Sequence, residues 1–527
     1  MIFTLALALS GVEGLLAQEP LPERWLYCQT NLQVDANADA LDVLWRRAAK
    51  AGYTGVLLAD SKGAKLNDVP KVYFKNAERM KALAAELKLK IVPALFHIGY
   101  SNAMLWHDPN LAEGLPVKDA LFVVKGGEAR LVADPDVALK PKWGWIDETF
   151  DASFTAKDPA GKNARFSQKV KVKPFRQYHV SVRVKTQDFK GGETKILVLG
   201  KPGSLVHSYP GIKPTQDWTE HHAVFNSLES EEVGLYFGTW GGQSGTIQWA
   251  DPKIEEVGLL NLLRRDGCPF EIKTEDGKVL VEGKDYQKVV DPLLGSKPYN
   301  GSYTIWHAPP AIKTSLPDGT RLRVSYHHTV TIHDGQVAAC PSEPRTVELL
   351  RDEAKRMHAL WGAKGYMMSH DEIRQLGWDD ACRKRNLDAG AILADNVKTC
   401  VKILKETNPG GEIYVWNDMF DPHHNAKKDY YLVRGDLTGS WEGLDPDVII
   451  VAWYFGKRDE TYDFFTKRGH RVLAAGYYDG DPVSNARGWV EAAKKHPGKA
   501  AGIMYTTWER DFSHIEKFID TVRESLK

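Results

Sequence analysis

Short apolar runs alternate with amphipathic segments over the first hundred residues of the chain. The runs at 25–29, 54–60 and 90–97 are rich in aliphatic residues, whereas 40–51 and 76–87 repeat apolar positions every three or four residues. The first pattern predicts buried strands, and the second predicts helices that cover them. Strands that alternate with helices in this way are typical of a parallel sheet.

The same alternation returns near residue 345 and continues to the end of the chain. Helices are predicted over 345–360, 389–406 and 512–526. Five more strands are predicted, at 365–372, 412–418, 448–454, 471–479 and 501–509. With the first three strands they make eight, the number that closes an α/β fold into a (β/α)8 TIM barrel.

Between the two parts of the barrel the hydrophobic period changes to two. Residues 166–172 and 178–185 alternate apolar and polar side chains, and Gly, Pro and Asp separate such runs. This pattern predicts an all-β jelly-roll sandwich inserted after strand three. The predicted organisation in chain order is barrel at 18–110, sandwich at 133–259, a small β segment at 260–335 that returns to the barrel, and barrel again at 336–527.

The N-terminus has the features of a secretory signal. An apolar run at 2–9 is too short to span a bilayer, and small residues follow it up to a cleavage site after Ala17. We therefore expect 1–17 to be a signal peptide and the protein to be secreted or periplasmic, with a misassigned start or an N-terminal tail as the alternative. No later segment reaches the roughly 20 apolar residues of a membrane helix, so no membrane partner is expected.

Charge and cysteine content exclude several classes of protein. The 69 Lys and Arg residues balance 69 Asp and Glu residues, which argues against a nucleic-acid partner. The cysteines are scattered without a Cys-x-x-Cys pair, so neither a disulfide framework nor a zinc or redox motif is predicted, and no metal or cofactor is expected. The five cysteines are Cys28, Cys268, Cys340, Cys382 and Cys400.

Polar and aromatic residues gather at the C-terminal ends of the predicted strands, where barrel enzymes carry their chemistry. The candidate residues there are His97, His370, Asp371, Glu372, Trp416, Asp418, Trp453, Tyr478, Asp479, Trp508 and Glu509. Sugar rings stack on aromatic faces while their hydroxyls bond to carboxylates and amides. Together with 16 Trp residues in the chain, this set predicts an oligo- or polysaccharide site.

These strand ends resemble the catalytic barrel of the β-N-acetylhexosaminidases of glycoside hydrolase family 20. The resemblance rests on the Asp-Glu pair after strand four, the Trp of strands five and six, the Tyr-Asp of strand seven and the Trp-Glu of strand eight. It implies that Glu372 is the general acid/base and that Asp371 orients a 2-acetamido group, whose carbonyl oxygen attacks the anomeric carbon.

The resemblance also implies roles for the residues around this pair. Tyr478 would bond the acetamido oxygen, and Glu509 would hold distal hydroxyls. Trp416, Trp453 and Trp508 would wall the pocket, and His370 would bond a substrate hydroxyl or tune Asp371. Two positions differ from the family pattern: Ser369-His370 replace two glycines, and strand one has Gln29 where an arginine is usual.

Physical reasoning about the acidic pair leaves alternatives open. Adjacent carboxylates repel, which raises the pKa of one and keeps a proton available for a leaving group. Asp371 and Glu372 would also suit the first turn of a helix. One rival function is a barrel glycosidase on galactose-type or other neutral glycans with a different carboxylate nucleophile. Another is a non-catalytic polysaccharide-binding protein.

The inserted sandwich resembles jelly-roll carbohydrate-binding modules. The residues that carry this resemblance are 143–147, 161–166, 178–181 and 247–254. Trp240 and Trp249 are candidates for a stacking platform, although tryptophans on β-strands more often belong to a core.

Overall fold

The computed structural model describes residues 21–144, 163–295, 303–333 and 335–527. The predicted signal peptide at 1–17 lies outside these residues, as do 145–147 and 161–162 of the segments likened to carbohydrate-binding modules. No helix within the described ranges is long and apolar enough to cross a membrane.

Eight parallel strands form a closed barrel, which confirms the predicted (β/α)8 fold. Around the barrel these are β1 (Glu23–Gln29), β2 (Gly55–Ala59), β3 (Lys90–Leu95), β14 (Gly365–Met368), β16 (Glu412–Trp416), β18 (Ile449–Ala452), β19 (Val472–Tyr477) and β20 (Ala500–Thr506). β20 pairs with β1 and closes the ring. β14 pairs with β3, so the long insertion between Leu95 and Gly365 follows strand three, as predicted.

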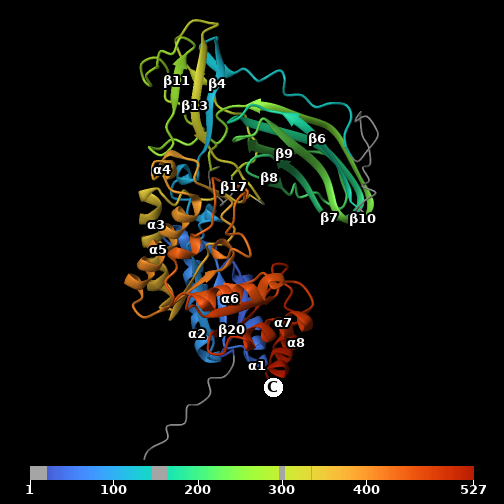
Figure 1. Ribbon diagram of the computed structural model, residues 1–527, viewed down its shortest axis with the longest axis vertical. Coiled ribbons are helices and arrows are strands. Elements are labelled where there is room, and N and C mark those ends of the chain that lie inside the picture. The colour runs from blue at the N-terminus through green and yellow to red at the C-terminus, as the bar shows by residue number, and fades with distance from the viewer. Residues whose placement is uncertain (1–20, 145–162, 296–302, 334) are drawn as a thin grey trace, which may run out of the picture.

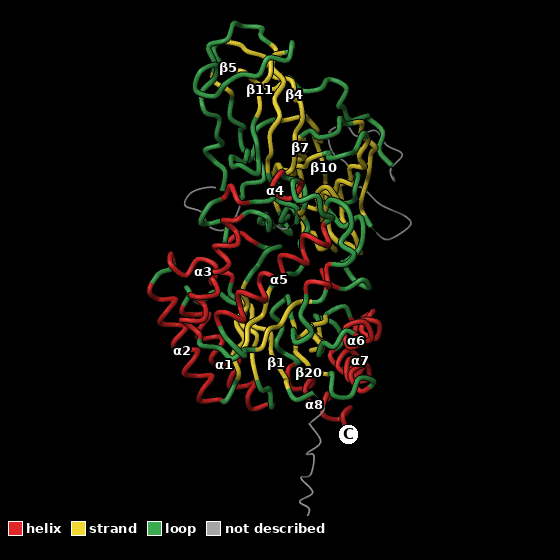
Figure 2. Tube along the Cα trace, turned by 60° about the vertical axis from the view of Figure 1, so that its left-hand side comes forward, coloured by secondary structure: helices red, strands yellow, loops and turns green. Residues whose placement is uncertain are grey.

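Helices cover the outside of the barrel (Figure 2). They are α1 (Asp35–Ala51), α2 (Lys71–Leu87), α3 (Pro344–Trp361), α5 (Ala389–Thr407), α6 (Arg458–Lys467), α7 (Pro482–Lys494) and α8 (Ile515–Leu526). The short helix α4 (Asp380–Arg383) lies where the barrel meets the insertion. Short 3-10 turns are η1 (Ser61–Asp68), η2 (Ser101–Ala103), η3 (Pro109–Leu111), η4 (Asp418–Phe420), η5 (Ser440–Gly443) and η6 (Phe455–Lys457). α1 shows why the pattern worked: its buried residues Ala38, Leu41, Trp45 and Ala48 recur at helical spacing.

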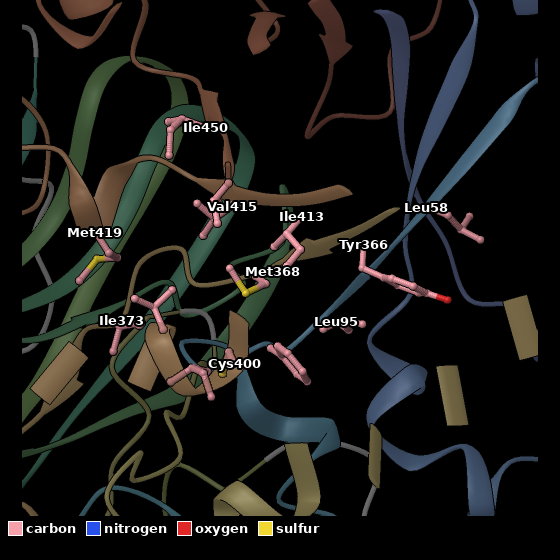
Figure 3. Packing of buried hydrophobic residues seen from close by; sticks show 14 of the residues in the cluster. Leu58, Leu95, Tyr366, Met368, Ile373, Cys400, Ile413, Val415, Met419 and Ile450 are labelled. Carbon is pink, nitrogen blue, oxygen red and sulfur yellow. The ribbon is translucent and has the colours of Figure 1, made fainter. Parts of the chain in front are cut away.

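Alternate strand residues face two different cores. Leu57 of β2 and Met367 of β14 point into the barrel interior, where they pack with Trp25, Tyr414 and other large side chains. Their neighbours Leu58 and Met368 point outward to the layer between strands and helices. Figure 3 shows part of that outer layer, in which strand residues lie near Cys400 of α5. Strands buried on both sides read as continuous apolar runs.

The insertion contains two antiparallel sheets and lies at one end of the barrel (Figure 1). The first comprises β6 (Ala164–Lys171), β7 (Gln177–Leu199), β8 (Ser204–Ser208), β9 (Gln216–Asn226) and β10 (Glu232–Val257). The long strands β7 and β10 pair along their lengths, with register shifts near their middle. β9 pairs with the first half of β7 and β8 pairs with its end.

The two halves of this sheet share one apolar core, which gives it the character of a sandwich. Trp249, on the second half of β10, packs its ring 5.7 Å from Phe166 and 6.0 Å from Phe237. Trp249 is fully buried. Of the two interpretations of this residue, the core applies, because its faces are covered by other core side chains and cannot stack on a sugar. Trp240 is half-buried, and the Lys195 ammonium lies over its ring, 5.2 Å from the centroid.

The second sheet joins residues from both ends of the insertion. Its strands are β4 (Leu115–Lys125), β5 (Glu128–Leu131), β11 (Glu271–Thr274), β12 (Ile312–Lys313) and β13 (Arg321–His328). β13 pairs with β4, so the predicted small β segment at 260–335 forms its sheet with residues 115–131. No strand was predicted at 115–131. Its partner strand lies some two hundred residues later in the sequence, so their pairing leaves no local pattern.

Loops at the barrel mouth pack against the insertion. β15 (Gln375–Leu376) and β17 (Leu432–Val433) form a small parallel pair in the loops that follow β14 and β16. The Trp378 indole donates a hydrogen bond to the Leu432 carbonyl oxygen at 2.9 Å. Both residues belong to the sandwich core. The loop that follows the fourth barrel strand is thus held from outside by the insertion.

Barrel closure depends on a glycine at the β20–β1 seam. A Cβ on Gly502 would lie 2.1 Å from the Glu23 carbonyl oxygen. We expect Gly502→Ala to lower the free energy of unfolding by about 1–3 kcal/mol, because the two strands must separate to admit the methyl group. Urea denaturation measures this, with Ala500→Ser in the same strand as the control. Equal stability of the two variants would contradict the prediction.

Candidate functional site

A cavity of about 1090 Å³ opens at the C-terminal ends of the barrel strands. Its barrel lining includes Tyr27, Gln29, His97, Tyr100, Asp371, Glu372, Arg374, Trp416, Trp453, Tyr478, Trp508 and Glu509. The insertion adds Glu193, Tyr209 and His333, the last of which follows β13. The cavity is large enough for more than one sugar ring, since sites for drug-sized ligands occupy about 300–1,000 Å³.

Aromatic side chains on or just after five barrel strands form a continuous wall. Trp453 and Tyr478 stack with ring centroids 5.2 Å apart and planes 4° from parallel. The edge of Trp508 meets Tyr478 at 5.7 Å. Tyr27 contacts Trp508 at 5.1 Å and Trp416 at 6.0 Å. The contacts hold the rings in place, so they offer a preformed apolar surface of the kind that binds sugar faces.

The acidic pair lies where the chain leaves β14 and crosses the barrel mouth. Glu372 adopts a left-handed backbone, with φ of 48°. The Gln336 side chain holds this turn by donating to the carbonyl oxygens of Glu372 at 2.7 Å and Gly99 at 2.9 Å. A Cβ on Gly99 would lie 2.3 Å from the Asp371 carbonyl oxygen, so only glycine permits this close approach.

Two neighbours bind the carboxylate of Glu372. Arg374 Nη2 lies 2.6 Å from Glu372 Oε1, and the Tyr100 hydroxyl donates to Oε2. The Arg374 side chain is 4% exposed and also donates to Gln336 Oε1 at 2.5 Å. Glu372 itself keeps 26% exposure toward the cavity. Glu372 is therefore held by an ion pair on one oxygen and by a hydroxyl on the other.

Asp418 lies beneath the pair and is fully buried. Its Oδ2 accepts from the backbone N–H of Glu372 at 2.9 Å and from Asn425 Nδ2 at 3.0 Å. Its Oδ1 accepts from the Trp453 indole at 3.4 Å. Burial, with the charge of Glu372 in addition, raises the pKa of Asp418 to about 7.

The site retains a proton near neutral pH. Burial and the charges of Asp418 and Glu372 raise the pKa of Asp371 well above its usual range. Three carboxylates thus lie close together beside one guanidinium, that of Arg374. Like charges in one site cannot all ionise at little cost, so a proton stays in the cluster.

Eight of the predicted site residues line the cavity together. They are His97, Asp371, Glu372, Trp416, Trp453, Tyr478, Trp508 and Glu509. Burial, followed by the charge of Lys62, lowers the pKa of His97 to about 4, so its imidazole is neutral near pH 7. Glu509 is exposed at the rim. Convergence of residues from widely separated strands is what a barrel mouth provides.

Three predicted substrate-binding residues lie outside the cavity lining. His370 is fully buried, faces α5 and lies 3.1 Å from Asn396 Oδ1, because strand alternation turns it away from the barrel axis. Asp418 supports the pair from below instead of facing the cavity. Asp479 accepts from the backbone N–H groups of Trp508 at 2.7 Å and Glu509 at 3.4 Å. These residues position other groups of the site, and their contact with a substrate stays a prediction.

Several cavity residues had no place in the predicted site. Arg374 could have been found as a basic residue two positions after the acidic pair, close enough along the chain to bind a carboxylate. Tyr100 follows strand three closely and carried a weaker signal of the same kind. His333 lies near the point where the chain returns to the barrel, a position from which either the rim or a strand cap could be reached, and it lines the cavity. Glu193 and Tyr209 reach the cavity only through tertiary packing, and the sequence offers no signal for them.

Comparisons with known proteins give distant matches only. No family model and no curated protein matches the sequence. Among solved structures, the chain is similar to a rhamnosidase from Novosphingobium sp. PP1Y, with 13% identity, 96% of this chain and 59% of that chain covered, and a TM-score of 0.34.

Two further solved structures are glycosidases acting on N-acetylglucosamine, by their descriptions. A glycoside hydrolase family 20 β-N-acetylglucosaminidase shows 7% identity over 96% of this chain and 73% of that chain, with a TM-score of 0.37. A pneumococcal exo-β-D-N-acetylglucosaminidase shows 9% identity over 96% of this chain and 84% of that chain, also with a TM-score of 0.37. Such identities and TM-scores are too low to assign an activity to this chain.

Buried Asp418 makes the stability of the protein pH-dependent. Its pKa is about 7 in the folded protein against 3.8 in an unfolded chain, so between these values the folded state holds a proton that the unfolded state has lost. Stability therefore falls as pH rises from about 4 to about 7. We expect Asp418→Asn to flatten this decline in the melting temperature, whereas exposed Asp447→Asn leaves it unchanged. An identical pH profile for both variants would contradict this reasoning.

Proposed function

We propose that this protein is a glycoside hydrolase that cleaves an oligo- or polysaccharide at the barrel mouth. One observation carries the proposal: the adjacent carboxyl groups of Asp371 and Glu372 open into a cavity walled by Trp416, Trp453 and Trp508. Hydrolysis of a glycosidic bond needs a proton donor and a negative group that stabilises a positively charged transition state. The proton-retaining acidic pair provides both, beside a surface that holds a sugar ring.

The favoured mechanism is retaining and substrate-assisted on a 2-acetamido sugar. Glu372 gives a proton to the glycosidic oxygen as that bond breaks, while the acetamido carbonyl oxygen forms a bond to the anomeric carbon. Asp371 orients the acetamido group and stabilises the charge that develops on it. Water then opens the cyclic intermediate after Glu372 takes its proton. The charges of Glu372, Asp418 and Asp371 add to burial in raising the pKa of Tyr478, which supports a position of its hydroxyl beside the pair.

The ionic neighbours of Asp371 and Glu372 support an alternative mechanism, in which the same two residues exchange roles. Arg374 forms an ion pair with Glu372 and not with Asp371, whereas burial and the charges of Asp418 and Glu372 raise the pKa of Asp371. In this alternative Asp371 donates the proton and Glu372 attacks the anomeric carbon directly. No acetamido group is needed, so neutral glycans would also be substrates.

Paired substrates and variants separate the two mechanisms. A proton donor matters for a poor leaving group and little for a good one, such as 2,4-dinitrophenolate. In the favoured mechanism, Glu372→Gln lowers kcat on a methylumbelliferyl 2-acetamido-glycoside by about 10²–10⁴ but spares the dinitrophenyl glycoside. Asp371→Asn then loses activity on both, and glycosides lacking the acetamido group are not turned over.

The opposite pattern identifies the alternative mechanism. Rescue of Asp371→Asn by the good leaving group, with turnover of glycosides lacking the acetamido group, would reverse the two roles. Glu460→Gln, an exposed carboxylate on α6, is the matched control and should keep full activity. Binding of glycans without turnover by the unmutated protein would overturn hydrolysis itself.

The insertion forms part of the proposed substrate site. Tyr209 and Glu193 line the cavity from the β-sandwich, so they would contact sugar units beyond the one cleaved. We expect Tyr209→Ala to raise KM for an oligosaccharide several-fold and to leave KM for an aryl monosaccharide nearly unchanged. Trp218→Ala, on β9 of the same sandwich and outside the cavity lining, is the control. Equal effects on both substrates would contradict an extended site.

A further inference from the structure

A buried cluster of two thiols and two carboxylates lies outside the cavity, where the insertion meets the barrel. Glu113 precedes β4, Cys340 precedes α3, Asp379 caps the start of α4 and Cys382 lies within α4. All four side chains are fully buried. One oxygen or sulfur atom of each lies within 4.8 Å of the other three. Three chain segments that are distant in the sequence therefore meet at one point.

The separations inside the cluster match the edges of a small tetrahedron. Cys340 Sγ lies 3.6 Å from Cys382 Sγ and 3.5 Å from Asp379 Oδ1, and Cys382 Sγ lies 3.8 Å from Glu113 Oε2. Tetrahedral zinc has bonds of about 2.3 Å to sulfur and about 2.0 Å to oxygen, which imply about 3.8 Å between two sulfurs, about 3.5 Å between sulfur and oxygen and about 3.3 Å between two oxygens. Three of the six separations are thus close to zinc edges, and all six lie within 4.8 Å.

The second oxygen of each carboxylate is already bound by other groups. Glu113 Oε1 accepts from the backbone N–H of Trp378 at 2.8 Å, and Asp379 Oδ2 accepts from Arg265 at 2.7 Å. Asp379 Oδ1 also accepts from the backbone N–H of Cys382 at 3.0 Å. These bonds turn Glu113 Oε2 and Asp379 Oδ1 toward the thiols. Hydrogen bonds that orient ligands in this way are typical of metal sites.

Charge also argues for a cation among these residues. Two fully buried carboxylates share one guanidinium, that of Arg265, which also pairs with Glu343. A buried carboxylate without enough positive charge costs several kcal/mol. A divalent cation between the carboxylates and the thiols would remove this cost.

We propose that Glu113, Cys340, Asp379 and Cys382 bind one Zn²⁺ ion in a closed tetrahedral site. Binding releases the protons of both thiols to solvent and forms two zinc–thiolate and two zinc–carboxylate bonds, with no change in oxidation state. Two sulfur ligands disfavour Ca²⁺ and Mg²⁺, which prefer oxygen. Four protein ligands leave no position for a substrate, so the ion is structural.

The proposed ion would stabilise the loop that carries the acidic pair. This loop runs from Asp371 to α4, and its residue Trp378 connects Glu113 to the sandwich core. Zinc would fix the far end of the loop to the segments before β4 and α3. Removal of the zinc ion should therefore lower the melting temperature of the protein, with a smaller effect on glycan binding.

Metal analysis and cobalt substitution test the proposal on the full-length protein. We expect one Zn²⁺ per chain after dialysis under reducing conditions, and zinc-edge X-ray absorption that shows mixed sulfur and oxygen ligands. Co²⁺ in place of Zn²⁺ should give a thiolate-to-cobalt band and the intense visible bands of tetrahedral cobalt. Cys340→Ser and Cys382→Ser should lose these signals, whereas Cys400→Ala, a buried cysteine of α5, should keep them.

Other results would overturn the site. Intact-mass analysis that finds a Cys340–Cys382 disulfide in the purified protein would replace zinc by a covalent link. Metal-free protein after exposure to zinc, or equal zinc in the serine variants, would also refute the proposal. If the serine variants fail to fold, X-ray absorption on the unmutated protein decides the question, because a ligand shell without sulfur excludes this site.

Discussion

The buried carboxylate of Asp418 joins the acidic pair to the aromatic wall of the cavity. One of its oxygens accepts from the backbone of Glu372, and the other accepts from the indole of Trp453. Because these bonds come from one rigid group, the position of the proposed proton donor and the position of the sugar-stacking surface are linked. Asp418 also raises the pKa of Asp371 and so helps to keep a proton in the site. Asp418 thus both positions the acidic pair against the aromatic wall and favours a proton on Asp371.

The insertion is a structural part of the barrel mouth as well as a separate β-rich layer. Trp378 and Leu432, from loops of the barrel, pack within the sandwich core, while Glu193 and Tyr209 of the sandwich line the cavity. Contacts in both directions hold the two parts in one arrangement. The sandwich therefore shapes the outer part of the cavity directly, in addition to any glycan binding by its own surface.

Buried acidic groups lie close to one another both at the cavity and at the junction of barrel and insertion, and their charge is balanced differently at the two places. At the cavity, Arg374 neutralises one of three carboxylates, and protonation accounts for part of the remaining charge. At the junction of barrel and insertion, Arg265 neutralises part of the charge on Asp379 and Glu113, and two thiols face their remaining oxygens. The first arrangement suits proton transfer to a ligand that enters from solvent, whereas the second is closed and suits a permanently bound cation.

The sequence by itself determined the barrel, because strands buried on both faces and helices with one apolar face leave patterns of fixed period. It also brought Asp371, Glu372, Trp416, Trp453, Tyr478, Trp508 and Glu509 to one rim, since the ends of parallel strands in a closed barrel must meet there. Only the tertiary structure decided the rest. The direction of His370 and Asp479, the pairing of 115–131 with 260–335, and the meeting of Glu113 with Cys340, Asp379 and Cys382 depend on contacts between distant segments. Such contacts have no period and no local spacing, so no pattern along the chain records them.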